Sequence, residues 1–362
     1  MKRIILKILS AVLSVAMLFS LISCSFLDEI SKTPVQDTEE TTKAPNNDNP
    51  PVAKYNRAKL KYTFLTVVEG VQEGVPALIS YSVFDTANGT LSELQIPAST
   101  YINASQAQNT LGAMFKKDYS SAKSGGREAA IASACTAMMD RLKTELLFEC
   151  DYYIYFDKKS MTDLTDLLGG IDVKIPFEMR FSDASVIKQG DTKLTGDNLW
   201  KVMSYGSFAS GSELNMAKLL WTGIFNKLKT VVTTESISLF MLDIRANLYT
   251  SVPKTNGVDI FFLRNLLSLD AESYKFSSAD VQSVVLESSA VSVICKNAFL
   301  EKMNSFLKIY DESVEANDLD KGSIFNNPSL TTVSAIYNSF NATSSVYSAG
   351  SVFSANLSII AK

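Results

Sequence analysis

Segments with the spacing of strands alternate with segments of helical spacing along the middle of this sequence. Three early runs are rich in β-branched and aromatic residues and are predicted to be strands: 61–68, 78–84 and 91–96. The Asn88-Gly89 pair predicts a tight turn between the second and the third. The segment 129–147 then carries apolar residues at helical spacing. This alternation predicts an α/β fold, a layered α-β-α domain with a central mixed sheet flanked by helices.

The alternation continues toward Tyr310. Further strands are predicted at 152–156, 171–175 and 290–295. Helices are predicted at 160–168, 198–203, 212–232, 261–269 and 299–310, and a helix or a loop at 277–285. We expect Ser160 to cap the first of these helices. Gly169-Gly170 is expected to end it, because glycine tolerates the left-handed conformation that follows many helix C-termini.

The N-terminus has the layout of an export signal. Three basic residues in the first seven positions precede an uncharged run, 8–22, which is shorter than the roughly 20 apolar residues that span a bilayer. Leu21-Ile22-Ser23-Cys24 resembles the bacterial lipobox, in which the cysteine becomes the first residue of the mature protein and carries lipid. We therefore expect a signal peptide at 1–23 and a lipid on Cys24 that anchors the protein to the outer face of a membrane.

Composition divides the rest of the chain. Residues 25–54 are rich in Asp, Glu, Thr, Asn and Pro and carry few apolar side chains, so 24–54 is expected to be a lipidated cysteine with a disordered linker. One domain is expected over 55–310. The remainder, 311–362, is expected to be a Ser/Asn-rich extension, which from 326 onward reads as short strands or a loosely ordered tail.

Charge and the absence of one residue type exclude several function classes. Three of the 34 basic residues and none of the 38 acidic ones lie in the signal peptide, so the mature chain has a formal charge of −7. An acidic chain of this kind is not expected to bind nucleic acid. The sequence contains no histidine, which excludes Ser-His-Asp and Cys-His nucleophile pairs and every histidine-ligated metal site.

Three cysteines remain after Cys24, namely Cys135, Cys150 and Cys295, without CxxC spacing. No zinc cluster is expected from them. Two of them could pair in an exported protein, but each lies in an apolar run, which favours buried thiols.

Three blocks of sequence carry a resemblance to a known family. Pro76–Thr100, PALISYSVFDTANGTLSELQIPAST, is a strand-turn-strand pattern, and Asp151–Pro176 contains Asp-Tyr-Tyr, Leu-Leu-Gly-Gly-Ile-Asp-Val and a closing proline. Leu194-Thr195-Gly196 then precedes a long helix. In this order and spacing, the blocks resemble the LytR-CpsA-Psr family. Its members are extracytoplasmic and transfer glycopolymers from a polyprenyl pyrophosphate lipid onto the cell wall.

The resemblance implies a site that this chain mostly lacks. The family uses arginines that grip the pyrophosphate and acidic residues that hold magnesium. The acidic residue that opens the family's second strand corresponds here to Ala77, and the Arg-Asp of Ile-Pro-Arg-Asp-Thr corresponds to Ala98-Ser99, with Thr100 retained. No cofactor is expected, and magnesium would bind only if the family site were retained in altered form.

The family's later arginines are also replaced. Its Arg-x-Arg falls on Ser204-Tyr205-Gly206, and the motif that follows falls on Ser212, Asn215, Lys218 and Leu219. Only Lys218 preserves a positive charge, and a lysine cannot reproduce the bidentate contacts of a guanidinium group. Because the loss of one such contact costs about 2–4 kcal/mol, the loss of several is expected to abolish the transfer.

These observations favour a binding protein with a degenerate LytR-CpsA-Psr-like domain. We expect it to act in cell-envelope glycopolymer assembly by holding a polyprenyl-linked or other amphiphilic ligand. The candidate groove residues are Ser99, Thr100, Ser204, Asn215 and Lys218. The family fold holds the lipid tail between helices and sheet, so the Leu, Met and Phe residues of 129–148 and 219–240 are candidates to line it.

Two alternatives remain open from the sequence. The first is an active phosphotransferase or pyrophosphatase with rearranged ligands, whose candidate groups are Lys201, Lys218, Arg127, Arg180, Asp172 and Asp197. Each of these is also explained as a solvated surface charge. The second is a structural or partner-binding surface lipoprotein that uses the Ser/Asn-rich extension.

Overall fold

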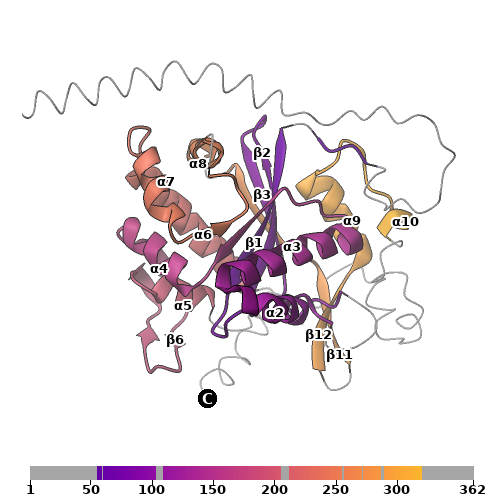
Figure 1. Ribbon diagram of the computed structural model, residues 1–362, viewed down its shortest axis with the longest axis horizontal. Coiled ribbons are helices and arrows are strands. Elements are labelled where there is room, and N and C mark those ends of the chain that lie inside the picture. Colours follow the sequence, from indigo (N-terminus) through magenta and orange to yellow (C-terminus); the bar gives the residue numbers. More distant parts are fainter. Residues whose placement is uncertain are drawn as a thin grey trace, which may run out of the picture. The chain divides into compact units, whose positions relative to one another are not determined.

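A six-stranded mixed sheet forms the centre of the computed structural model (Figure 1). Its strand order is β10-β3-β2-β1-β4-β9. The strands are β1 (Lys61–Glu69), β2 (Pro76–Asp85), β3 (Thr90–Ile96), β4 (Tyr152–Phe156), β9 (Tyr249–Thr250) and β10 (Tyr274–Ser278). The β1–β4 and β3–β10 pairs are parallel and the other three are antiparallel, so the predicted mixed sheet is confirmed.

The structure describes residues 55–58, 60–102, 109–204, 212–254, 257–270, 272–286 and 289–319. The expected signal peptide, the lipidated Cys24, the linker to residue 54 and the tail from 320 lie outside the described residues. Within them, no helix is long and apolar enough to cross a membrane.

The hairpin between β2 and β3 turns where the sequence predicts it. Gly89 has φ of 58°, a left-handed conformation that glycine adopts without strain. The carboxylate of Asp85 accepts hydrogen bonds from the backbone N–H groups of Ala87 and Asn88, at 3.1 and 3.0 Å. The turn and its register therefore follow from local sequence.

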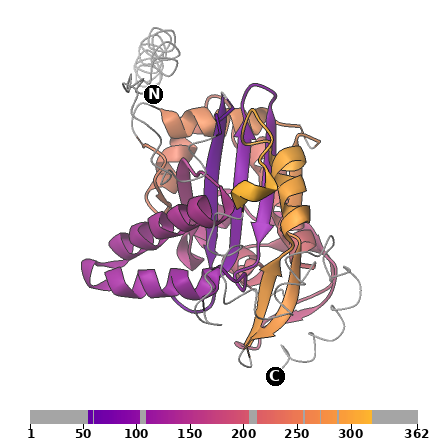
Figure 2. The same cartoon turned by 90° about the vertical axis from the view of Figure 1, so that its right-hand side faces the viewer.

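One face of the sheet is covered by a helical hairpin. It consists of α2 (Leu111–Ala122), a short 3-10 turn (Lys123–Gly125) and α3 (Arg127–Leu146), with α9 (Lys296–Glu301) beside it (Figure 2). Alternate residues of the strands, among them Leu65, Ile79 and Tyr81, join Met138 and Phe299 in one buried cluster. This face is densely filled.

Five helices cover the opposite face. They are α4 (Lys158–Leu167), α5 (Asn198–Met203), α6 (Ser212–Val231), α7 (Ile237–Arg245) and α8 (Val258–Ser268). The intervening strand residues, such as Phe64, Val68 and Leu78, point to this side. The sheet thus lies between two layers of helices, as the fold prediction requires.

Small sheets and a terminal helix complete the described chain. The pairs are β5 (Ile171–Ile175) with β8 (Gly190–Leu194), β6 (Met179–Arg180) with β7 (Val186–Ile187), and β11 (Val281–Leu286) with β12 (Ser289–Ile294). The last helix is α10 (Ala316–Leu319). Val314 and Leu319 belong to the same buried cluster as Tyr55 and Tyr310, so the packed domain continues past Tyr310.

Asp151, the first residue of the Asp-Tyr-Tyr block, has a structural role. Its carboxylate pairs with both terminal nitrogens of Arg57 and accepts the backbone N–H of Thr63 at 2.8 Å. It thereby ties the segment before β1 to the start of β4.

The structure corrects the predicted cap of α4. The cap is Asp157, whose side chain accepts the backbone N–H of Ser160 at 2.8 Å, while Ser160 Oγ accepts the backbone N–H of Asp157 at 2.8 Å. Ser160 is therefore the third residue of the helix and the partner of Asp157 in a reciprocal capping box. The predicted end of the helix is confirmed, because Gly169 and Gly170 follow it with positive φ.

Three further predictions need correction. Residues 277–285 were predicted to be a helix or a loop and instead form parts of β10, whose partner β3 comes from a distant segment, and of β11, which pairs with the next strand, β12. The predicted helix 299–310 is α9 followed by a π-helical turn, Lys302–Leu307. Helices α2 and α7 were not predicted. In α7, the exposed Leu239 and Leu242 obscure the helical spacing of the buried Ile237, Phe240, Met241 and Ile244.

The structure agrees with the interpretation of the three cysteines as thiols. Cys135 and Cys295 are buried and Cys150 is partly buried, and all three are thiols. Burial raises the pKa of each, and that of Cys295 to about 11. They are therefore poor nucleophiles at neutral pH.

Close packing of α6 on β5 generates a stability prediction. A Cβ on Gly223 would lie 2.8 Å from Ile171 Cγ2 and 2.9 Å from Val173 Cγ1. Gly223→Ala should lower the free energy of unfolding by about 1–2 kcal/mol, because overpacking outweighs the gain in helix propensity. Urea unfolding measures the change. Asn226→Ala, at an exposed position of α6, is the control and should be neutral or stabilising. Equal stability of the two variants would contradict the close contact.

Candidate functional site

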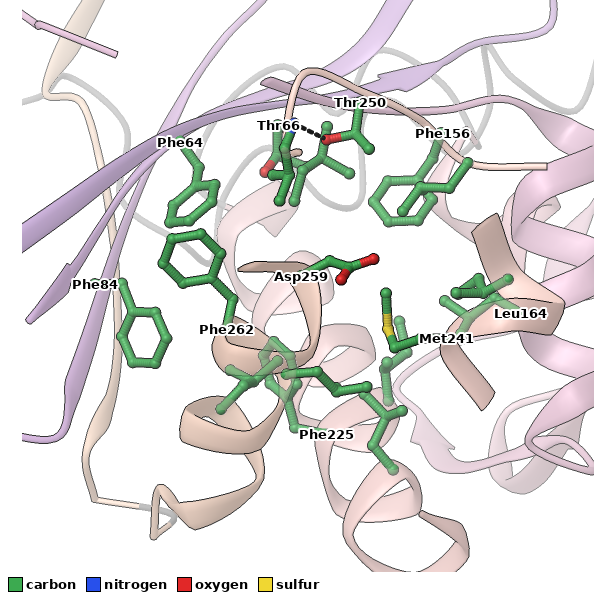
Figure 3. Close-up of a pocket in the computed structure, with 18 of the residues that line it drawn as sticks. Phe64, Thr66, Phe84, Phe156, Leu164, Phe225, Met241, Thr250, Asp259 and Phe262 are labelled. Carbon is green, nitrogen blue, oxygen red and sulfur yellow. Dashed lines mark hydrogen bonds between the residues drawn. The ribbon is translucent and has the colours of Figure 1, made fainter. Parts of the chain in front are cut away.

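An apolar cavity of about 230 Å³ lies between the sheet and helices α6, α7 and α8 (Figure 3). We call this space the cavity. Its apolar walls are formed chiefly by Phe64, Phe84, Leu91, Ile154, Phe156, Leu164, Trp221, Ile224, Phe225, Leu228, Phe240, Met241, Ile244, Phe262, Leu263 and Leu266. An apolar cavity of about 150 Å³ already binds benzene in a well-studied protein, so this one is large enough for part of a hydrocarbon chain.

Amphipathic patterns in α6 and α7 create the cavity. In α6, Trp221, Ile224, Phe225 and Leu228 recur at helical spacing and face the sheet. Phe225 lies edge-on to Tyr274 of β10, with ring centroids 4.4 Å apart. Large rings hold the helix away from the strands, so a space remains between them.

An ion pair joins two helices that form the wall of the cavity. Arg245, at the end of α7, donates to Asp259, at the start of α8, through Nε at 2.5 Å and a terminal nitrogen at 2.6 Å. Figure 3 shows the Asp259 carboxylate beside Phe262 and Met241. Because the contact is bidentate, the charges of both side chains are engaged by each other.

Glu93 is the other carboxylic acid that lines the cavity. It lies in the middle of β3, is 5% exposed and accepts a hydrogen bond from the Tyr274 hydroxyl at 2.7 Å. Burial raises its pKa to about 7, an effect that the hydrogen bond from Tyr274 partly offsets. Sequence reasoning missed this residue, since one glutamate in LSELQI reads as solvent-facing.

The structure places the two predicted lining segments differently. Trp221, Phe225 and Phe240 of 219–240 line the cavity. Ile131, Met138 and their neighbours in 129–148 instead fill the core under α3, on the other face of the sheet.

The five predicted groove residues do not converge on the cavity. Ser99 and Thr100 follow β3 and lie beside β12, where Ser99 Oγ is 2.8 Å from Ser292 Oγ. Ser204 is buried at the end of α5, and Lys218 is exposed on α6. Tyr205, Gly206 and the side chain of Asn215 lie outside the described part. Of the described side chains that line the cavity, none belongs to this predicted set.

A second cluster, which we call the Arg127 network, lies where β1 ends. Arg127, the first residue of α3, donates to Glu69 at 2.7 Å, to Glu73 at 3.0 Å and to Asp157 at 3.1 Å. Sequence reasoning favoured a solvated surface charge for Arg127, which is wrong: its partners Glu69 and Asp157 are buried. Those partners come from distant parts of the chain, so no local pattern reveals them.

The carboxylates of this network are saturated. Glu69 Oε1 accepts from the Tyr155 hydroxyl at 2.6 Å and from the backbone N–H of Gly74 at 2.8 Å. Lys123 and Tyr119 each donate to Glu73 at 2.7 Å, which lowers the pKa of Glu73 to about 2. Three carboxylates face two cations, so the network is net negative and does not favour a phosphate.

These residues do not fit a magnesium site. Magnesium needs oxygen ligands that are free to meet it octahedrally, whereas the network's carboxylate oxygens are hydrogen-bonded to the protein. Among the described residues, no group of three or more acidic or cysteine side chains is placed to hold a metal. Ala77 occupies the position at which the family has an acidic residue. It lies beside Gly70, the residue after Glu69, and its methyl group cannot bind a metal ion.

The remaining candidate charges lie apart. Lys201 pairs with Asp183 at 2.8 Å and approaches Asp197 at 3.7 Å, and with a side chain 15% exposed it is not the solvated charge that was favoured. Asp172 and Arg180 have side chains 71% and 68% exposed, as a solvated charge requires.

Solved structures with similar folds give an independent comparison. Protein gbs0355 from Streptococcus agalactiae aligns with a TM-score of 0.56 and 13% identity, over 74% of this chain and 92% of that one. TagV from B. subtilis aligns with a TM-score of 0.51 and 15% identity, over 74% and 98%. TagT, solved bound to LI-WTA, aligns with a TM-score of 0.51 and 12% identity, over 78% and 98%.

At these identities the likeness establishes the fold alone. TagV and TagT are LytR-CpsA-Psr proteins, so the described chain has a LytR-CpsA-Psr-like layered fold, in agreement with the fold that the resemblance in sequence implies. A scan against protein-family models finds no match, and a search of curated proteins finds none either.

The Arg127 network predicts a large effect on stability. Arg127→Met leaves the buried carboxylates of Glu69 and Asp157 without their cation and should lower the free energy of unfolding by about 3 kcal/mol. Arg180→Met removes an exposed pair with Glu178 and should change it by less than about 0.5 kcal/mol. Chemical denaturation compares the two, and a similar small effect for both would show that the network is not stabilising.

Glu93 predicts a pH dependence. Between about pH 4.5 and 7 the folded protein holds a proton on Glu93 that the unfolded chain releases, so stability should fall as the pH rises. The Glu93→Gln variant has no carboxyl group at this position, so its stability does not fall in this way. Its free energy of unfolding relative to the wild type should therefore increase by about 3 kcal/mol from pH 4.5 to 8. Urea midpoints measured across this range test the prediction, and parallel curves for the two proteins would refute it.

Proposed function

We propose that this protein is a cell-envelope lipoprotein that binds the apolar chain of a polyprenyl-linked or other amphiphilic ligand and does not transfer it. The observation that carries the proposal is the cavity, a preformed apolar space between sheet and helices. A filled interface at this place would have favoured a purely structural role. Apolar pockets of this kind are the usual sites for small hydrophobic ligands.

The chemistry at the family's site supports binding without transfer. Ala77 and Ala98-Ser99 stand where the resemblance calls for acidic residues and arginine, and among the positions that correspond to the family's later motif only Lys218 is basic. The nearest arginine-containing cluster, the Arg127 network, is already neutralised by its own carboxylates. Stabilisation of charge on a transferring phosphoryl group needs free cationic donors, and these residues supply none.

The location and partner follow from the same reasoning. A lipid on Cys24 would hold the domain at the outer face of the membrane through the linker 25–54, close to lipid-linked precursors. The similar protein TagT was solved with LI-WTA, which supports a cell-wall polymer precursor, such as a teichoic acid intermediate, as the ligand class.

A cavity-filling variant tests this function. Ile224 lies in the wall of the cavity on α6 and is 1% exposed, so Ile224→Trp should fill the space and reduce binding of the uncharged polyprenol undecaprenol at least tenfold. Native mass spectrometry of the full-length protein measures the bound fraction. Asn226→Trp places the same ring on the exposed side of the helix and should bind as the wild type does.

Two results would contradict the proposal. Equal binding by Ile224→Trp would place the lipid elsewhere on the protein. Magnesium-dependent release of phosphate from a polyprenyl pyrophosphate by the wild type would establish the alternative of an active enzyme.

A further inference from the structure

The face of the sheet that lies toward the cavity carries a row of buried polar side chains. Because strand residues alternate between faces, Glu93 and Gln95 of β3 point to the same side as Ser80 and Ser82 of β2 and Thr66 of β1. The strand register pairs Thr66 with Ser80, Ser80 with Gln95, and Ser82 with Glu93. All five are less than 10% exposed. A purely hydrocarbon ligand gives no reason for such a row.

Trp221, which lines the cavity on α6, has an indole Nε1 without a hydrogen-bond partner among the described residues. In the polar row, Ser80 Oγ and Gln95 Oε1 are also without a partner, but neither residue lines the cavity. The indole Nε1 is a donor. Buried polar groups are nearly always paired, so an unpaired donor in the cavity wall indicates that an acceptor group of a ligand meets it.

The charges around the cavity restrict what that group is. Glu93 is the acid of the inner wall, and Tyr274 of β10 donates to it. Arg245 of α7 is held by Asp259 of α8, and Lys254 is an exposed residue whose Nζ lies 3.4 Å from the backbone oxygen of Arg245. No described cation is therefore both unpaired and placed to meet an anion beside Glu93.

We propose that the cavity selects an amphiphile that bears an uncharged hydroxyl or amide group, which hydrogen-bonds to Glu93 and to Trp221 Nε1, and rejects an anionic group at the same place. This inference rests on the proposed function, because it assumes that an apolar chain occupies the cavity. A hydroxyl or an amide both donates and accepts, and so matches an acid and an indole N–H together. An anion can only accept and would face the Glu93 carboxylate.

The rejection of anions should strengthen with pH. Burial raises the pKa of Glu93 to about 7, so the side chain gains its charge as the pH passes through that value. The other ionisable groups that line the cavity are Lys254 and the Arg245–Asp259 pair, and Tyr274 contacts Glu93 from β10.

Two probes of equal chain length test the inference. The full-length protein is loaded with the neutral fluorescent dye N-phenyl-1-naphthylamine, which 1-decanol or decanesulfonate then displaces at pH 5.5 and 8. In the wild type at pH 8, decanol should displace the dye at a concentration at least tenfold lower than decanesulfonate, and this ratio should be smaller at pH 5.5.

Variants assign the selectivity to one side chain. Glu93→Leu removes both hydrogen bond and charge and should bring the two probes within about threefold. Glu93→Gln should retain the affinity for decanol and bind decanesulfonate more tightly, because the amide still accepts and donates but carries no charge. Glu145→Gln changes an equally buried glutamate in α3, on the other face of the sheet, and should match the wild type.

The outcomes separate the two proposals. If the dye and both probes fail to bind, the cavity is not a ligand site and both proposals are wrong. If both probes bind in the cavity with similar affinity, and Glu93→Leu changes nothing, the selectivity is refuted while the proposed function stands.

Discussion

The structure depends on the burial of both faces of one mixed sheet, and the two faces are buried differently. Residues of one parity, such as Leu65, Ile79 and Tyr81, meet the α2–α3 hairpin and α9 in a densely filled core. Residues of the other parity meet α6, α7 and α8, which stand off the strands on large aromatic rings and leave the cavity. Each face buries a large cluster of hydrophobic side chains and so contributes to stability. The cavity lies on the side of α6, α7 and α8.

The Arg127 network contributes to the stability of the fold. It joins the ends of β1 and β4 to the start of α3 and to the loop before β2. A site that grips diphosphate requires cations whose partners are absent until the substrate arrives. Here the Arg127 guanidinium group is already paired with three protein carboxylates, so its charge stabilises the fold. The LytR-CpsA-Psr-like fold is present, and the side chains between its sheet and α6 enclose an apolar cavity.

Local sequence was sufficient for the central strands and the longer helices. Patterns typical of strands are present in the sequences of β1, β2 and β3, and the Asn88-Gly89 turn connects β2 to β3. These local patterns are sufficient to predict the hairpin without knowledge of its surroundings. Two segments were not predictable in this way. The strand β10 has a weak pattern of its own and pairs with the distant β3, and β11 is a strand because β12, the next strand along the chain, pairs with it.

The site was harder to predict than the fold for the same reason. In β3, Glu93 and Gln95 follow the alternation of a strand with one solvent-exposed face. That face is buried in the fold, where β10 pairs beside β3 and helices cover the sheet. One signal was available, since Ser80, Ser82, Glu93 and Gln95 share a parity on neighbouring strands. Ser99, Thr100, Ser204, Asn215 and Lys218 were chosen from the family's diphosphate positions, and the cavity lies on a different part of the scaffold.

The most direct test of the central claim is a crystal structure of the protein soaked with a bromine-terminated alkyl alcohol, with the bromine located by anomalous scattering. The account predicts one strong bromine peak between α6 and the sheet, with the hydroxyl group beside Glu93 and Trp221. Bromine peaks confined to the protein surface, with side chains filling the space between Ile224 and Phe64, would contradict it.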